Sequence, residues 1–239
     1  SGDSFLNFSE TTPTTYSGQL TGSGTVTKNG TGSLTMSGNN SGFTGPLFVQ
    51  SGTLFLDGAY GGSVTSSASA HIVYKGPISG NLDITSGTIT TNGINTLQVG
   101  GNYTQAPNTI YIANLSSSGQ SSLINIAGTA GIAGSVQIDA SLGVLPNHTY
   151  EILHANGGVS GTYGLINPYP GLKVSITYDA NDVYLSFGSS FLALAATPNE
   201  KNVAAQLDKL IPTTTSENKL LSALLVLTPA EIRKALNIL

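Results

Sequence analysis

Residues 32–36 read GSLTM, and residues 52–56 read GTLFL 20 positions later. The same kind of stretch, a glycine followed by alternating polar and apolar residues, returns as GNLDI at 80–84 and GNYTQ at 101–105. Alternation with a period of two residues is typical of a β-strand. A repeat of about 20 residues, with a glycine at the corner before each strand, is typical of a solenoid. We therefore predict a mainly β fold in which the coils of a parallel β-helix stack along one axis.

In such a solenoid the apolar residues of one strand face are expected to line up along the axis. We predict that Leu34, Leu54, Leu82 and Tyr103 form one inward stack. Side chains on stacked strands lie about 4.8 Å apart, so like charges in one ladder repel, whereas Asn, Ser and Thr can pair with their copies. This spacing explains why charged residues make up only 8% of the chain.

The composition limits the classes of function. The chain has 239 residues, of which 39% are hydrophobic, so it can bury a core and does not resemble a disordered linker. The net charge of −4 and the absence of basic runs argue against nucleic acid as a partner, because phosphates need clustered Lys and Arg. There is no cysteine, and the longest apolar run, residues 191–196, is far shorter than the roughly 20 residues of a transmembrane helix.

Three segments differ in their pattern. Residues 1–119 carry the repeat and are expected to form the β-helix shaft. In residues 120–188, SSLINIAG and GSVQIDAS alternate around residues 128–134 as a hairpin would, and LKVSITY and DVYLSF flank a turn at residues 179–181. We predict a hairpin-rich capping module there. Residues 189–239 are expected to form a short α-helical tail.

The helical tail carries start signals. Thr197 can cap a first helix, with Pro198 at the first position and Glu200 completing a capping box. Ser216 is expected to cap a second helix, and TPAE at residues 228–231 repeats the capping box for a third.

The apolar residues of the tail recur at helical spacing, and Pro212 is expected to end the first helix. An exposed apolar stripe of this size is unfavourable in water, so we expect the tail to fold back against the hairpin-rich module. Pairing with another copy of the chain is the alternative. The stripe consists of Leu220, Leu221, Leu224, Leu225, Ile232, Leu236 and Leu239.

Gly2-Asp3-Ser4 is a serine context found in GDSL-type esterases, so Ser4 has to be weighed as a nucleophile. A serine hydroxyl needs a base and a third group that orients the base. No aspartate lies three residues before a histidine, as the GDSL-type pattern requires, and Phe5 replaces the glycine of the trypsin-like context. We interpret the stretch as the start of a short strand, and no catalytic residue is predicted.

The histidines and carboxylates offer no better site. His71 is expected to face solvent, His148 lies in a predicted turn, and His154 ends a predicted strand. A zinc site needs three or four convergent ligands; the spacing predicts none, so we expect neither metal ligands nor a cofactor. Asp57 and Asp83 could lie on neighbouring coils, which leaves glycan cleavage as an alternative function.

Seven tyrosines could form an aromatic surface that faces a ligand. Their alternation fits core or cross-strand packing better. They are Tyr103, Tyr111, Tyr150, Tyr163, Tyr169, Tyr178 and Tyr184.

The order of these parts resembles the passenger region of Gram-negative autotransporters, the type V secreted proteins. Residues 16–57 resemble the passenger-associated repeat of that family. GNYTQ with SLINIAGTAGIAGSVQI, YEILHANGGVSGTY and SITYDANDVYLSF resemble the conserved C-terminal end of passengers. TPNEKNVAAQLDKL and LTPAEIRKALNIL resemble the helical linker that leads into the membrane barrel. The resemblance covers nearly the whole chain.

The resemblance implies a right-handed parallel β-helix on the cell surface or released from it, with residues 120–187 acting as an autochaperone-like segment. It also implies the protein's own outer-membrane β-barrel as a partner, which we expect to begin after Leu239 and to be absent from this chain. The same resemblance implies that the protein is tethered to the outer membrane of a Gram-negative bacterium.

The leading hypothesis is a non-enzymatic stalk and folding template for export, part of an adhesin or another surface virulence factor. Its further partners would be a host-cell surface or another passenger copy. One alternative is the stalk of a passenger enzyme whose catalytic domain lies upstream of Ser1. Another is a glycan-binding or glycan-cleaving β-helix.

Overall fold

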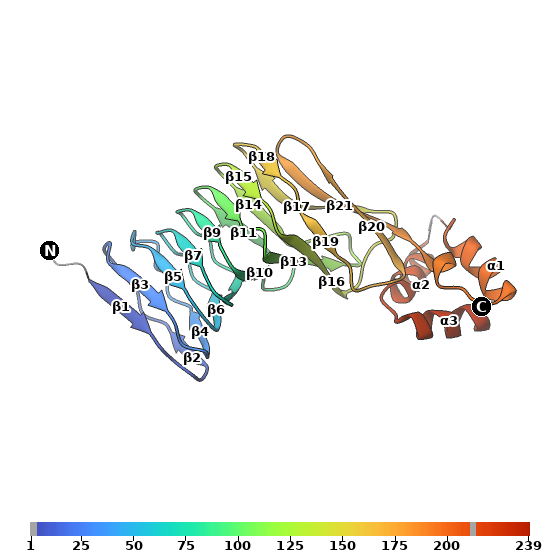
Figure 1. Cartoon of the computed structure of the whole chain (residues 1–239), viewed down its shortest axis with the longest axis horizontal. Coiled ribbons are helices and arrows are strands. Elements are labelled where there is room, and N and C mark those ends of the chain that lie inside the picture. Colours follow the sequence, from blue (N-terminus) through green and yellow to red (C-terminus); the bar gives the residue numbers. More distant parts are fainter. Residues whose placement is uncertain (1–3, 211–213) are drawn as a thin grey trace.

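The computed structural model describes residues 4–210 and 214–239, and its strands stack along one long axis (Figure 1). The N-terminus lies at one end of this axis, and the helices gather at the other end. The strands form three faces, which we call the first, second and third face. Every strand pair on the first two faces is parallel, which confirms the predicted parallel β-helix.

The strands of each face follow one another in space from coil to coil. The first face contains β1 (Phe5–Phe8), β3 (Thr25–Lys28), β5 (Leu47–Val49), β7 (Val64–Ser66), β9 (Leu82–Ile84), β12 (Tyr103–Gln105), β15 (Ala130–Ile132) and β18 (Val159–Gly161). The second face contains β2 (Thr14–Tyr16), β4 (Ser33–Met36), β6 (Thr53–Leu56), β8 (His71–Tyr74), β10 (Gly87–Thr91), β13 (Thr109–Ser116), β16 (Ser135–Leu142) and β19 (Gly164–Ile166). The third face contains β11 (Thr96–Val99), β14 (Leu123–Ile126), β17 (Thr149–Ala155), β21 (Asp182–Ser189) and β20 (Leu172–Tyr178).

The inward side chains form apolar ladders, but the predicted single stack is divided between two faces. Leu34 lies beside Leu54 on the second face, whereas Leu82 lies beside Tyr103 on the first. All four side chains are buried. The prediction of one stack was wrong because the 28-residue step from Gly52 to Gly80 is longer than one coil and carries the chain on to the next face.

Glycine permits the close approach of successive coils at one corner of the solenoid. A Cβ atom added to Gly45 would lie 1.7 Å from the carbonyl oxygen of Gly24, and one added to Gly62 would lie 1.9 Å from the carbonyl oxygen of Gly45. We call Gly24, Gly45 and Gly62 the glycine column. A Cβ atom at Gly45 or Gly62 would clash with a backbone carbonyl oxygen of the preceding coil. The repeated corner glycines are therefore a steric requirement of stacking.

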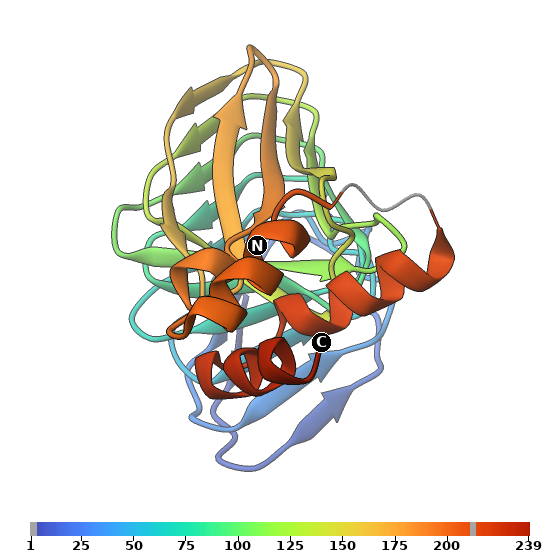
Figure 2. The same cartoon turned by 90° about the vertical axis from the view of Figure 1, so that its right-hand side faces the viewer.

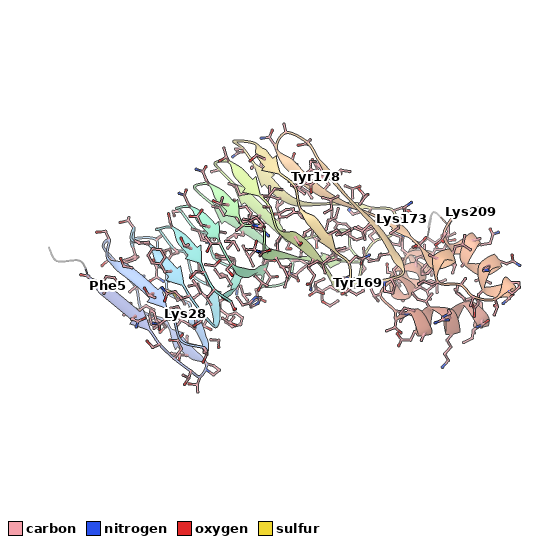
Figure 3. All side chains as sticks on the ribbon, viewed as in Figure 1. Phe5, Lys28, Tyr169, Lys173, Tyr178 and Lys209 are labelled. Carbon is pink, nitrogen blue, oxygen red and sulfur yellow. The ribbon has the colours of Figure 1, made fainter. Side chains whose placement is uncertain are left out.

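Lys28 is a charged exception inside the shaft, near its N-terminal end (Figure 3). Its side chain is fully buried, and its Nζ lies 3.1 Å from Oε1 of Glu10. The same Nζ donates hydrogen bonds to the carbonyl oxygens of Gly30 at 2.7 Å and Ser51 at 3.0 Å. An ion pair and two hydrogen bonds thus offset the cost of taking the ammonium group out of water.

One predicted hairpin is present and the other is not. Strands β20 and β21 pair antiparallel around residues 179–181, as expected. The stretch around residues 128–134 instead contains the short strand β15, and β14, β15 and β16 pair in parallel with β11, β12 and β13 of the preceding coil. The second hairpin prediction was wrong because alternation identifies a strand but not the direction of its partner.

The tail forms a short 3₁₀ helix and three α-helices, each α-helix begun by a capping box. The bounds are η1 (Phe191–Ala193), α1 (Pro198–Leu207), α2 (Thr215–Leu225) and α3 (Pro229–Ile238). Thr197 and Thr228 cap α1 and α3 as predicted. The cap of α2 is Thr214 rather than Ser216, because Thr214 has Glu217 three residues later to complete the box. Pro212 lies outside the described residues.

The tail folds back across the end of the solenoid, as expected (Figure 2). Ser222 of α2 donates a hydrogen bond of 2.6 Å to the carbonyl oxygen of Val144, in the loop between β16 and β17. Most of the apolar stripe is covered, since Leu221, Leu225 and Ile232 are buried. Leu220 and Leu239 remain exposed. Among the described residues, no helix combines the length and apolar character needed to cross a membrane.

Candidate functional site

A β-bulge in β17 places two titratable side chains on one face of the sheet. Strand β17 pairs antiparallel with β21, and the register shifts between Glu151 and Leu153. Ile152 and Leu153 consequently both point into the core, and Glu151 and His154 both lie on the outer side. In a regular strand, residues three apart would point to opposite faces.

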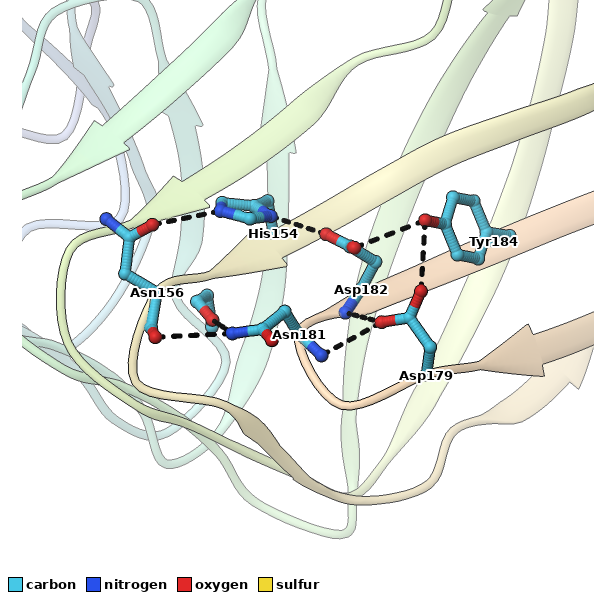
Figure 4. Close-up of polar contacts among 7 residues, drawn as sticks. His154, Asn156, Asp179, Asn181, Asp182 and Tyr184 are labelled. Carbon is cyan, nitrogen blue, oxygen red and sulfur yellow. Dashed lines mark hydrogen bonds and ion pairs between the residues drawn. The ribbon is translucent and has the colours of Figure 1, made fainter.

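His154 stands at the centre of a polar cluster that joins β17 to β21 (Figure 4). Its Nδ1 lies 2.5 Å from Oδ1 of Asp182, and its Nε2 lies 3.0 Å from Oδ1 of Asn156. The other oxygen of Asp182, Oδ2, accepts a hydrogen bond of 3.2 Å from the hydroxyl of Tyr184. Both ring nitrogens of the histidine and both oxygens of this carboxylate therefore have defined neighbours.

The turn between β20 and β21 holds Asp182 in position. Oδ1 of Asp179 accepts hydrogen bonds from the backbone amides of Asn181 at 2.9 Å and Asp182 at 2.8 Å, as aspartate does in turns. The side-chain amide of Asn181 donates to the carbonyl oxygen of Ala155 at 2.6 Å. These bonds tie the hairpin tip to the end of β17, so the carboxylate faces His154 from a fixed backbone.

The electrostatic environment shifts the pKa values of the cluster. The hydrogen bond to Asp182 raises the pKa of His154 above its ordinary value, because the carboxylate stabilises the imidazolium. Desolvation raises the pKa of Glu151, and the nearby negative charge of Asp182 adds to this effect. Backbone hydrogen bonds, first that from Asn181, lower the pKa of Asp179. The cluster thus contains one imidazole and the carboxyl groups of Glu151, Asp179 and Asp182.

Glu151, His154 and Asp182 each offer one possible ligand atom, and these atoms lie within 4.8 Å of one another. The sequence predicted no convergent ligands. Two features of the structure create the site. The bulge brings positions 151 and 154 to one face, and the antiparallel register with β21 adds position 182. The turn at residues 179–181 indicates only the pairing of β20 with β21.

The structure does not bring Ser4 together with a base. Its carbonyl oxygen accepts a hydrogen bond from the amide of Thr25, next to β1. His71 contacts the hydroxyl of Thr88 on the second face, and burial lowers its pKa. His148 lies 3.1 Å from the carbonyl oxygen of Gly119. Within the described part of the chain, no hydrogen bond joins Ser4 to a histidine.

The two aspartates weighed for glycan cleavage lie on different faces. Asp57 follows β6 on the second face. Asp83 belongs to β9 on the first face, where its carboxylate accepts a hydrogen bond from the hydroxyl of Thr104. Glycoside hydrolysis requires two carboxyl groups on either side of one bond, and this placement does not form such a pair.

The tyrosines occupy the core and its margin, in agreement with the packing interpretation. Tyr103, Tyr111, Tyr150 and Tyr163 are buried. Tyr169 and Tyr178, seen in Figure 3, are partly buried against the core, and each accepts a backbone hydrogen bond through its hydroxyl, from Ala140 and Tyr163 respectively. Only Tyr184 belongs to the polar cluster.

Residues 26–54 match the family model described as passenger-associated-transport-repeat. Two extracellular serine proteases of Serratia marcescens are similar to the chain. One is 31% identical over 210 residues and the other 30% identical over 219 residues, and each match covers 82% of this chain and 20% of the relative. The chain therefore spans about a fifth of the length of these relatives.

A third relative is the adhesin BmaC autotransporter of Brucella suis biovar 1 (strain 1330). It is 29% identical over 197 residues, which cover 72% of this chain and 6% of that protein. These relationships imply secretion to the cell surface or the extracellular space. The repeat, the parallel solenoid and the relatives support the resemblance seen in the sequence: the chain is a passenger region of the type V secreted autotransporters.

Proposed function

We propose that this passenger region is a stalk and a folding template for export, within an adhesin or another surface virulence factor. The observation that carries the proposal is the continuous parallel pairing from β1 to β18, in which each strand bonds only to the coils before and after it. In such an array, stability depends on contacts between neighbours. A coil can form on a folded neighbour much more easily than alone.

The C-terminal end is suited to be that first folded neighbour. Strand β17 pairs with β14 in parallel on one side and with β21 antiparallel on the other. The hairpin of β20 and β21 needs only a short turn to close, so its contacts are local and form early. We therefore propose three units: a shaft at 1–119, a template module at 120–188, and a linker at 189–239.

Pulse-labelled hydrogen exchange during refolding of the full chain tests the template. We expect amides of β17, β20 and β21 to become protected first, and protection to spread toward β1. Simultaneous protection along the shaft, or protection that begins at β1, would contradict the proposal.

In this proposal the linker leads into the protein's own outer-membrane β-barrel, which would tether the stalk to a Gram-negative cell surface. The passenger relationship supports a linked barrel in the intact protein. A host-cell surface or a second passenger copy would be the outer partner.

A second candidate is the stalk of a passenger enzyme. It is favoured by the relatives named extracellular serine proteases, of which this chain matches only a fifth. In this candidate the catalytic groups lie in other parts of the protein, and Ser4 takes no part. A fluorophosphonate probe should therefore leave Ser4 unlabelled, and the Ser4→Ala variant should show the same background hydrolysis as the parent chain. Covalent labelling of Ser4 would overturn that assignment.

A further inference from the structure

The polar cluster at the junction of β17 and β21 brings one imidazole and two carboxyl groups together on the outer side of the sheet. Oδ1 of Asn156 can only accept a hydrogen bond, so Nε2 of His154, 3.0 Å away, carries the proton. Its other ring nitrogen, Nδ1, faces Oδ1 of Asp182 at 2.5 Å. A metal ion that takes the place of the proton between these two atoms would be bound by both of them.

We propose that Glu151, His154 and Asp182 bind one divalent first-row transition-metal ion, of which Zn²⁺ is the model case. The three ligand atoms come from two strands and already lie within 4.8 Å of one another. Imidazole nitrogen with carboxylate oxygen is a donor set that zinc accepts. Ca²⁺ and Mg²⁺ prefer six or more oxygen ligands, so they fit this site poorly.

The spacing of the ligand atoms requires only local adjustment. Zinc bonds to nitrogen and oxygen are about 2.0–2.2 Å, so tetrahedral ligand atoms lie roughly 3.4 Å apart. The ion would widen the 2.5 Å separation of His154 and Asp182 and draw the Glu151 carboxylate inward. Glu151 is a long, exposed side chain on the outer side of the sheet, so rotation about its own bonds can bring its carboxylate closer. A water molecule would complete the fourth position.

The neighbours of the cluster match the support that metal ligands need. A metal-bound histidine usually donates its other ring N–H to an acceptor, and Oδ1 of Asn156 occupies that position. The hydroxyl of Tyr184 donates to the second oxygen of Asp182, which orients that carboxylate. Asn181 fixes the hairpin tip to β17 through the carbonyl oxygen of Ala155.

Metal binding would join β17, the last parallel strand of the third face, to the hairpin. Two ligands belong to β17 and one to β21, and the register places His154 directly opposite Asp182. An ion at this position would hold the antiparallel register at the end of the third face. It would therefore stabilise the C-terminal end of the solenoid without adding a catalytic group.

Titration of the untagged full chain with Co²⁺ and Zn²⁺ at pH 7.5 tests the site. We expect one Co²⁺ per chain, visible absorption bands of a low-coordinate cobalt complex, and displacement of Co²⁺ by Zn²⁺. His154→Gln and Asp182→Asn should each abolish the bands. Asn156→Ala, which removes only the support of the histidine, should weaken binding by about 10–100-fold.

The matched control is His71→Gln, which removes a histidine whose contact is a threonine hydroxyl on another face. It should bind both metals like the parent chain. Circular dichroism checks that each variant keeps its β-structure. If a ligand variant unfolds, Asn156→Ala still tests the site, because Asn156 is exposed. Absence of cobalt bands in the parent chain, or binding unchanged by His154→Gln, would overturn the proposal. Loss of binding in His71→Gln would do the same.

Discussion

The shaft and the C-terminal end are stabilised by different kinds of interaction. In the shaft, one backbone pattern is repeated, and apolar ladders run from coil to coil. At the C-terminal end, an antiparallel hairpin, a cluster of charged side chains and three capped helices follow one another. Nine of the 20 charged residues lie in residues 189–239. The comparison shows that charge is scarce where the same side-chain position is stacked many times.

The reason is geometric. Neighbouring coils repeat a position at the spacing of paired strands, so a charge on one coil meets the copy on the next. Helix ends impose no such repetition, and their free amides favour acidic side chains. Lys28 supports the rule from inside the shaft, because it is paired with Glu10 rather than stacked on another charge.

The largest effect is expected when a charged residue replaces a buried apolar residue in each of the two regions. Val183 in β21 and Leu54 in β6 are both completely buried. Val183→Asp and Leu54→Asp should each lower the free energy of unfolding by on the order of several kcal/mol, because an unpaired carboxylate enters the core. If the hairpin end is the template, native-state hydrogen exchange should show protection lost along the whole shaft in Val183→Asp, but only near β6 in Leu54→Asp. Equal, local losses in both variants would contradict a template at the C-terminal end.

A smaller effect is expected at the glycine column of the shaft. Gly62→Ala should lower the free energy of unfolding by roughly 1–3 kcal/mol, since the new Cβ would overlap the carbonyl oxygen of Gly45. Gly42→Ala is the matched control, because its nearest neighbour to a new Cβ is 3.8 Å away. Urea unfolding followed by circular dichroism measures both. Similar stabilities for the two variants would show that the corner can widen.

Removal of residues 190–239 should have a modest effect on the solenoid. We expect the β-rich circular dichroism signal to remain and the melting temperature to fall by several degrees, because the tail covers the end of the sheets without entering the ladders. Loss of Phe191, whose side chain is fully buried, contributes to that fall. Collapse of the β signal would show that the tail belongs to the solenoid core.

The smallest effect concerns the pH dependence of the tail. The carboxylate of Glu200 accepts hydrogen bonds from the amides of Ala196 and Thr197, which lower its pKa below the ordinary 4.5. The stabilisation is therefore fully present above pH 4.5 and is lost as the pH falls through the lower pKa of the folded state. Thermal unfolding of the tail should weaken with acid in the parent chain and change less in Glu200→Gln. Identical acid profiles would show that this carboxylate does not contribute.

The sequence predicts most of the fold because the relevant signals are local. Strand alternation, corner glycines and the capping boxes at Thr197 and Thr228 each depend on residues a few positions apart. The sequence did not predict that Leu82 lies on a different face from Leu54. The length of the coils varies, and the alternation of residues does not show at which position the chain turns from one face to the next. The direction of pairing at residues 128–134 was missed because one strand pattern serves parallel and antiparallel partners.

The candidate site was missed for a different reason. Its residues are joined by a bulge in β17 and by a strand partner 28 residues away, and neither is written in a short window of sequence. Glu151 and His154 are three positions apart, which in a regular strand would place them on opposite faces. Only the pairing register with β21 shows that they meet Asp182.

The crosswise direction of the strands determines how the molecule would respond to a pulling force. Figure 1 shows the strands crossing the long axis, so tension between the two ends would load the hydrogen bonds of one coil boundary at a time. Each released coil of about 20 residues could extend to roughly 70 Å. Force spectroscopy should then record a series of small, similar steps at low force. A surface-anchored shaft of this design would lengthen under shear by unwinding coil by coil, and each coil could rewind on its neighbour when the load is removed.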